Sequence, residues 1–359
     1  MGEANSHAAF CSSLEIYPTS SHRDLDVTLW PAGRLAWLSK PALRKRFEQQ
    51  INQADGVHIH GLWEQSTSIA GRTARALRKP YILSAHGMLE PWALANKRFK
   101  KILYARLFER ANLEGATCLH ALTHAEARDY RSFGLRRPIA IVPNGVYIPD
   151  IVDPDLFLAQ YPGLKRKRIL LFLGRIHFKK GLDILVQAWA KVAKRWPDAH
   201  LVLAGPDFEG TRASIEELVQ QAGIGDQVLF TGMLRADLKW SALAAAQGFV
   251  LPSYSEGLSV AALEAMGTGL PVILTEQCNL PEVKTHQAGW QVESNVPSLT
   301  SAIEEFLSNS VTANLSVGKR GRRLVLERYN WAAVAAQMSE VYQWAQGGPA
   351  PANVDLLTV

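Results

Sequence analysis

The chain has 359 residues, of which 47% are hydrophobic and 20% are charged, and its formal net charge is +6. This is the balance of a folded globular protein, and it excludes a disordered or a fibrous chain. No apolar run approaches the roughly 18 residues that a membrane span requires. At about 100–200 residues per domain, the length predicts two domains.

The cysteines and the first residues indicate a cytoplasmic protein. Cys11, Cys118 and Cys278 are too few and too scattered for a disulfide framework, and they favour a reducing compartment. The opening residues MGEANSHAAF have neither the basic nor the apolar segment of a signal peptide.

The positive charge lies in the first half of the chain. Residues 1–150 hold 20 Lys and Arg against 13 Asp and Glu, whereas residues 151–359 hold 19 against 20. A basic half can face nucleic acid, an anionic membrane or a phosphorylated substrate. Because the chain has no nucleic-acid-binding motif, we expect no nucleic-acid partner.

The first half shows a faint alternation of strands and helices. Segments typical of strands lie at 25–30, 57–61, 81–87, 116–122 and 139–145. The stretch 96–112 is predicted to be a basic helix with an apolar stripe. The stripe either packs against the rest of the domain or contacts anionic lipid. A proline-containing segment, 149–168, ends in a basic cluster and is predicted to be a linker.

The second half repeats the alternation more clearly. Strands are predicted at 168–174, 200–205, 227–232, 249–253 and 271–275, with helices at 182–196, 211–222, 235–247 and 257–268. The sequence therefore predicts an α/β protein with two Rossmann-like, doubly wound domains that face a central cleft. Ligands bind such sheets at the carboxyl ends of the strands. The tail 347–354 is expected to be disordered.

Two acidic residues follow the strand at 249–253. Glu256 lies in the loop after the strand, near a predicted helix N-terminus at Gly257 that suits a diphosphate. Glu264 comes eight residues later, about 12 Å along a helix. Retaining glycosidases need carboxylates about 5–5.5 Å apart. The two residues therefore either hold the ends of one elongated ligand or are ordinary helix-face glutamates.

Two cations follow the strand at 168–174. Arg175 and Lys180 lie in GRIHFKKG (174–181), where they are placed to neutralise the charge of a departing diphosphate. The alternative is a basic surface loop without function. His58 and His60 share one face of a strand, as zinc ligands do, but no third ligand is near and we favour structural histidines.

Together these segments resemble the family-4 glycosyltransferases of the GT-B fold. The resemblance covers roughly residues 55–345 and rests on GRIHFKKG, LVLAGPD, VLFTG, the Glu256–Glu264 segment, PNGV and LERYNWAAVAAQMSEVY. It implies a retaining, metal-independent transferase that moves a sugar from a nucleotide-sugar donor to a glycan or lipid-linked acceptor. The donor is then a substrate, a UDP or GDP sugar, and no cofactor is needed. A sugar-nucleotide epimerase and a non-catalytic scaffold are the alternatives.

The resemblance also assigns roles to residues. It implies that Arg175 and Lys180 contact the diphosphate, that Glu264 binds the ribose and that Glu256 and His86 lie at the donor sugar. The other implied contacts are the N–H groups of Gly257, Leu258 and Ser259 at the sugar or phosphate, and Gly232, Met233 and Leu234 at the base.

The resemblance divides the chain into residues 1–148 on the acceptor side, the linker 149–168 and the nucleotide-sugar domain 169–330. A helix at about 331–346 returns to complete the first domain. Family members open with a strand and a glycine-rich loop, whereas residues 2–15 here look like the end of that loop and the helix after it. A late start codon, a truncated enzyme or a strand supplied by another segment are the three explanations.

Overall fold

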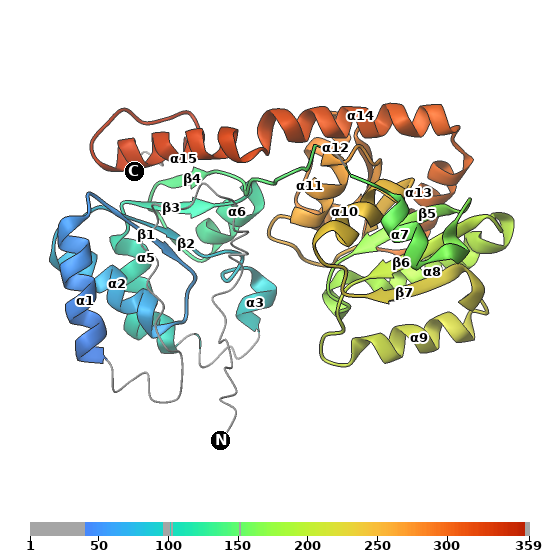
Figure 1. The fold of residues 1–359 in the computed structure, drawn as a ribbon. Helices are drawn as coiled ribbons and strands as arrows, with labels where there is room; N and C mark the ends of the chain where they lie inside the picture. The colour runs from blue at the N-terminus through green and yellow to red at the C-terminus, as the bar shows by residue number, and fades with distance from the viewer. Residues whose placement is uncertain (1–39, 96–100, 102, 151, 356–359) are drawn as a thin grey trace, which may run out of the picture.

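The structure is a computed structural model that describes residues 40–95, 101, 103–150 and 152–355. Two α/β domains lie side by side, each built on its own sheet (Figure 1). The expected strand at 25–30, the loop and helix at 2–15 and part of the basic stretch 96–112 lie outside the described residues.

The first domain contains a sheet in the order β1-β2-β3-β4-β11, in which the first four strands are parallel. Every residue of β2 and β3 is buried. Strands that are covered on both faces need apolar side chains at successive positions, which accounts for the apolar runs in the sequence. The strands are β1 Val57–His60, β2 Tyr81–Ser84, β3 Cys118–Ala121, β4 Ile139–Ile141 and β11 Val354–Asp355. The helices are α1 Lys40–Gln53, α2 Gln65–Ala76, α3 Pro91–Ala95, the π-helix η2 Ala105–Glu109, α5 Arg110–Gly115 and α6 His124–Ser132.

The expectation of a disordered tail at 347–354 is wrong. β11 pairs antiparallel with β4, and the N–H of Ile141 donates to the carbonyl of Asn353. Val354 is buried, and Asp355 forms an ion pair of 3.0 Å with Arg131. A strand of two residues behind a Gly-Pro-Ala segment is too short to leave a periodic signal in the sequence.

The second domain has a six-stranded, wholly parallel sheet in the order β10-β9-β8-β5-β6-β7. The strands are β5 Arg168–Leu173, β6 Ala199–Ala204, β7 Val228–Gly232, β8 Gly248–Leu251, β9 Val272–Thr275 and β10 Gly289–Val292. The sequence did not predict β10, a half-buried edge strand that begins with glycine. The helices are α7 Asp155–Gln160, α8 Leu182–Val192, α9 Thr211–Gln221, α10 Ala236–Ala245, α11 Val260–Gly267, α12 Glu282–Thr285, α13 Val296–Ser308 and α14 Val311–Arg328.

The strand order of the second sheet sets the place of a ligand. From β5 the chain winds outward through β6 and β7, then returns to the other side of β5 and winds outward through β8, β9 and β10. The loops after β5 and β8 therefore diverge at a topological switch point, where open α/β sheets bind ligands.

The chain returns to the first domain through two successive helices. α14 packs on α11 of the second domain, and α15 (Trp331–Ala345) continues over the first domain, so that the pair spans both sheets along the top of the molecule (Figure 1). Asn330 caps α15 by accepting a hydrogen bond from the N–H of Ala333. A Cβ on Gly145 would lie 2.6 Å from the ring of Trp331, so only glycine allows this close crossing.

A chain of hydrogen bonds fixes α15 to the first sheet. Tyr342 lies 2.7 Å from His58 Nδ1, His58 Nε2 lies 2.7 Å from Ser84 Oγ, Ser84 Oγ lies 2.7 Å from His120 Nδ1, and His120 Nε2 lies 2.8 Å from the carbonyl of Val142. Because a carbonyl only accepts, His120 Nε2 carries the proton. In neutral rings this sets every other direction: Ser84 donates to His120, His58 donates to Ser84 and Tyr342 donates to His58.

This series of hydrogen bonds, with its two buried histidines, makes the stability of the first domain sensitive to acid. Burial lowers the pKa of His58 to about 2 and that of His120 to about 4, whereas the unfolded chain binds these protons near pH 6.5. Stability is therefore present above pH 6.5 and is lost as the pH falls toward 4, by about 1–2 kcal/mol per histidine at pH 5. Unfolding in urea at pH 7.5 and pH 5 measures this loss.

The variant His120→Gln should show a smaller loss between these two pH values, because one titrating ring is gone, although it is less stable at pH 7.5. His124→Gln, which changes an exposed histidine of α6, is the control. If the free energy of unfolding depended on pH equally in wild type and His120→Gln, the proposed series of hydrogen bonds with neutral histidines would be contradicted.

Candidate active site

Two loops of the second domain meet at the switch point. One follows β5 and carries Arg175 and Lys180; the other follows β8 and carries Glu256. Gly181 ends the first loop in the left-handed region, and a Cβ there would lie 2.1 Å from the carbonyl oxygen of Pro252 in the second loop. Glycine at this position therefore lets the two loops touch.

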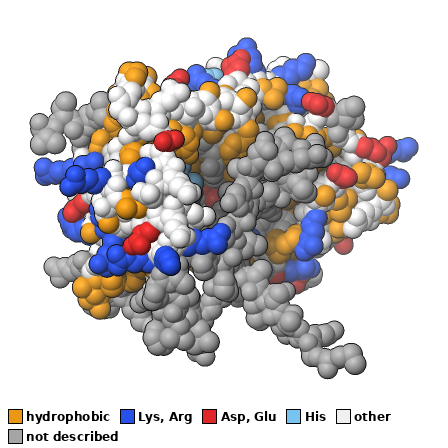
Figure 2. Space-filling view, turned by 60° about the vertical axis from the view of Figure 1, so that its left-hand side comes forward, with side chains coloured by type: hydrophobic (Ala, Val, Ile, Leu, Met, Phe, Trp, Pro, Cys, Tyr) orange, Lys and Arg blue, Asp and Glu red, His pale blue; other side chains and the backbone are white. Residues whose placement is uncertain are grey.

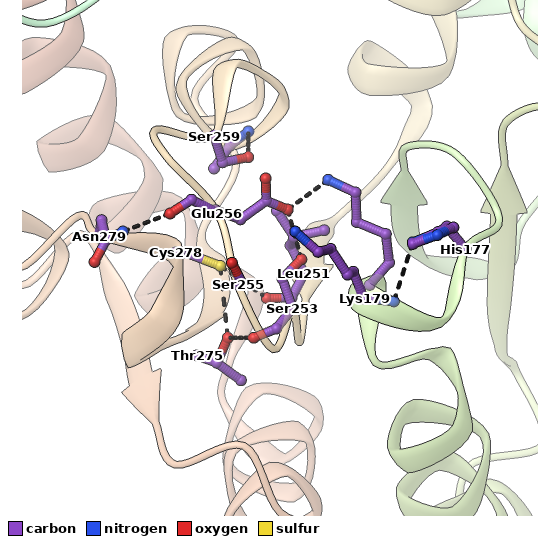
Figure 3. Close-up of polar contacts among 12 residues, drawn as sticks. His177, Lys179, Leu251, Ser253, Ser255, Glu256, Ser259, Thr275, Cys278 and Asn279 are labelled. Carbon is purple, nitrogen blue, oxygen red and sulfur yellow. Dashed lines mark hydrogen bonds and ion pairs between the residues drawn. The ribbon is translucent and has the colours of Figure 1, made fainter. Parts of the chain in front are cut away.

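The carboxylate of Glu256 is the centre of this contact. It forms an ion pair with the ammonium of Lys180, and it accepts a hydrogen bond of 2.6 Å from Ser253 (Figure 3). The side chains of Lys180 and Glu256 are only 18% and 13% exposed. Asn279 fixes the backbone by donating to the carbonyl of Glu256 at 2.5 Å. The structure thus brings together two residues that the sequence placed on separate loops.

Arg175 lies in the first of these two loops and is exposed. Its guanidinium carbon is 4.9 Å from the centre of the Phe208 ring, a stacking contact from the loop after β6. An exposed guanidinium supported on one face by an aromatic ring keeps its N–H donors available to an anion.

The helix α11 begins at Val260, so the expected helix start near Gly257 is wrong. Ser259 is the N-cap, and its side chain accepts a hydrogen bond from the N–H of Ala262 (Figure 3). With this cap the helix begins three residues later than predicted. Gly257 and Leu258 therefore lie in the loop, where a Cβ on Gly257 would meet no atom within 4 Å.

Glu264 lies further along α11 and is held by a residue that sequence reasoning missed. Its carboxylate lies 2.8 Å from the ammonium of Lys239 on α10, and both side chains are about 15% exposed, at 14% and 15%. The mutual neutralisation keeps a carboxylate in a site that is largely closed to water. A single lysine in a predicted helix carries no pattern that would have identified it.

The predicted base-binding residues lie at the end of β7. Gly232 has a φ of +71° and turns the chain out of the strand. Met233 is 51% exposed, while Leu234 is buried in the domain core. Only Met233 of the three thus presents its side chain to the surface.

In the first domain, His86 follows β2 in a strained conformation. Its φ is +52°, a left-handed value that is uncommon outside glycine and concentrates at functional sites. His86 Nε2 lies 2.8 Å from His60 Nδ1. Burial lowers the pKa of both rings, that of His60 to about 4, so both are neutral at physiological pH.

Glu126 anchors the loop that carries His86. This buried carboxylate accepts hydrogen bonds from the N–H of Gly87 at 2.6 Å, the N–H of Leu122 at 2.8 Å and the hydroxyl of Tyr130 at 3.1 Å. Three donors on one carboxylate hold the strained turn in place. Like Lys239, Glu126 and His60 were not among the predicted site residues.

The zinc alternative for His58 and His60 finds no support in the described part of the chain. No group of three His, Cys, Asp or Glu is placed to hold a metal ion among those residues. His58 and His60 stack with ring centres 4.1 Å apart.

Comparison with known proteins identifies the family. The profile of the glycosyl transferases group 1 matches residues 158–338, and that of the glycosyl transferase 4-like domain matches residues 13–145. The chain belongs to the group 1 glycosyl transferases. It is a glycosyltransferase of the GT-B fold, which confirms the predicted family, fold class and transferase activity and gives no support to the epimerase.

Individual relatives and structures agree with this assignment. The GDP-mannose:cellobiosyl-diphosphopolyprenol alpha-mannosyltransferase of Xanthomonas campestris is 25% identical over 311 residues, covering 83% of this chain and 76% of that protein. The sucrose-phosphate synthase of Thermosynechococcus elongatus has a TM-score of 0.70 at 25% identity, covering 88% of this chain and 80% of its own. Anabaena HepE in complex with UDP and glucose has a TM-score of 0.67 at 20% identity, covering 88% and 84%.

Proposed function

We propose that this glycosyltransferase takes a sugar from a nucleotide-sugar donor bound at the switch point and transfers it, with retention of configuration, to a glycan or lipid-linked acceptor. The observation that carries the proposal is the ion pair between Lys180 and Glu256 at the contact between the loops after β5 and β8, with the exposed Arg175 in the first of these loops. Cations placed there can stabilise the charge that develops on a departing diphosphate.

Each of the other residues has a part in this proposal. Glu264, held by Lys239, binds the ribose hydroxyls, and the chain around Met233 meets the base. Gly257, Leu258 and Ser259 offer backbone N–H groups to the sugar or phosphate. Neutral His86 approaches the donor sugar from the first domain. We infer that residues 1–148 with α15 bind the acceptor and that residues 169–330 bind the donor.

The donor is a UDP or GDP sugar in this proposal. Support comes from the solved structure of HepE with UDP and glucose and from a relative whose name specifies GDP-mannose and a diphosphopolyprenol acceptor. Side-chain cations provide the phosphate contacts, so we propose that no divalent metal is needed and that no cofactor takes part.

We also propose that the protein acts in the cytoplasm and touches a membrane through its first domain. Leu103, Leu107 and Phe108 are exposed beside the exposed Arg110. Figure 2 shows many Lys and Arg side chains on this face, mixed with hydrophobic and some acidic side chains. Within the described residues no helix has both the length and the apolarity to cross a bilayer. Stronger sedimentation with anionic than with neutral vesicles is the expected result.

A transfer assay tests the proposed chemistry. Purified protein is incubated with UDP-glucose or GDP-mannose and a membrane extract that supplies acceptors, with and without EDTA. We expect acceptor-dependent release of one nucleoside diphosphate that EDTA does not abolish. Loss of activity in EDTA and recovery with Mn²⁺ would contradict metal independence, and conversion of the donor to an epimer without acceptor would contradict the transferase.

Two variants separate binding from chemistry in the same assay. Glu264→Gln loses a charged hydrogen-bond acceptor for the ribose, so nucleotide affinity should fall by about 1.5–3 kcal/mol. Arg175→Ala should lower kcat more than affinity, because the charge on the leaving group is largest in the transition state. Lys165→Met, an exposed position on the second domain, is the control. Full activity of both variants would overturn the site assignment.

A further inference from the structure

The loop that carries His86 also reaches across to the second domain. Glu90 accepts a hydrogen bond of 2.8 Å from the hydroxyl of Ser255, a residue 165 positions away in the chain. Two positions further on, the ring of Trp92 lies 3.3 Å below the ammonium of Lys179 and 5.8 Å from the ring of Phe178. A hydrogen bond, a cation–π contact and an aromatic contact thus join the two domains at one place.

These contacts fall next to the donor-site residues in both loops. Lys179 precedes Lys180, and Ser255 precedes Glu256. The N–H of Tyr254 donates to the carbonyl of Lys179 at 2.7 Å, which ties one loop to the other behind the contact. The contacts that Glu90 and Trp92 make with Ser255 and Lys179 therefore also restrain the neighbouring backbone of Glu256 and Lys180. Figure 3 shows Lys179, Ser255 and Glu256 close together.

The groups around Glu90 act on its pKa in opposite directions, and the net direction is upward. Burial raises the pKa of Glu90, Lys179 of the second domain lowers it, and Glu126 and Glu256 raise it. Lys179 is the cation that acts on Glu90 across the interface, and it is also the one above Trp92. Separation of the domains would remove Glu90 and Trp92 from the ammonium and leave it with Glu256 of its own domain.

We propose that Glu90 and Trp92 form an interdomain clasp that positions His86 over the two donor-binding loops. Both are positioning residues, and this proposal rests on the proposed function of the site. The nucleotide contacts all lie in the second domain, so a weakened clasp leaves nucleotide affinity unchanged. It lowers the rate of transfer, because His86 no longer stays close to the donor sugar.

The kinetic test compares Trp92→Ala, Lys179→Met and the double variant. We expect each single variant to lower kcat by about fivefold to twentyfold with the donor KM changed less than twofold. The double variant should be no worse than the singles, because both remove one contact. Trp92→Phe should restore most of the rate, and Lys165→Met is the matched control for the lost lysine.

A second measurement tests the clasp without catalytic turnover, through the distance between the two domains. Spin labels on the exposed positions Arg136→Cys and Ser214→Cys report the distance between the domains. We expect one narrow distribution in the protein with saturating UDP or GDP and a broader, longer one after Trp92→Ala or Glu90→Ala. Glu90→Gln, which keeps an acceptor oxygen for Ser255, should stay close to wild type.

The outcomes are distinguishable. An unchanged distance distribution together with an unchanged kcat in Trp92→Ala overturns the clasp. A lowered kcat with an unchanged distribution also overturns it, because Trp92 then acts on a substrate directly. If wild type transfers no sugar, the proposed function fails while the distance measurement still decides whether the clasp exists. Trp92 is 42% exposed, so its replacement is compatible with a folded protein.

Discussion

The ion pair between Lys180 and Glu256 is the interaction on which the site depends. It joins the two loops that diverge from the centre of the second sheet, and it is largely shielded from water. A charged pair of this kind is stable only while each partner compensates the other. Under the proposed function, an anionic donor would give Lys180 a new partner and sugar hydroxyls would donate hydrogen bonds to Glu256, so donor binding would replace the ion pair.

The rest of the molecule serves to bring groups to this pair. The strand order places both loops at the switch point, and Gly181 lets them touch. The polypeptide returns through α14 and α15 and so ties the first domain to the second. The series of hydrogen bonds from Tyr342 to Val142 fixes α15 to the first sheet. The loop with the strained turn at His86 is anchored on Glu126, and it contacts the second domain where Glu90 accepts a hydrogen bond from Ser255.

The sequence predicted the features that repeat or that combine several residues. The apolar runs identified nine of the described strands, and the segments that hold Arg175, Lys180, Glu256 and Glu264 carried the family resemblance from which the donor-site hypothesis follows. It could not predict contacts made by single residues from distant segments. Lys239 is one lysine in a helix, β11 is two residues long, and the pairing of Glu90 with Ser255 depends on how two domains meet.

The most direct test of the central claim is a crystal structure with UDP or GDP bound. We expect the diphosphate within hydrogen-bonding distance of Arg175 and Lys180, the ribose on Glu264, and the carboxylate of Glu256 released from Lys180 toward the position of the sugar. A nucleotide bound elsewhere, with the ion pair between Lys180 and Glu256 intact, would contradict the account.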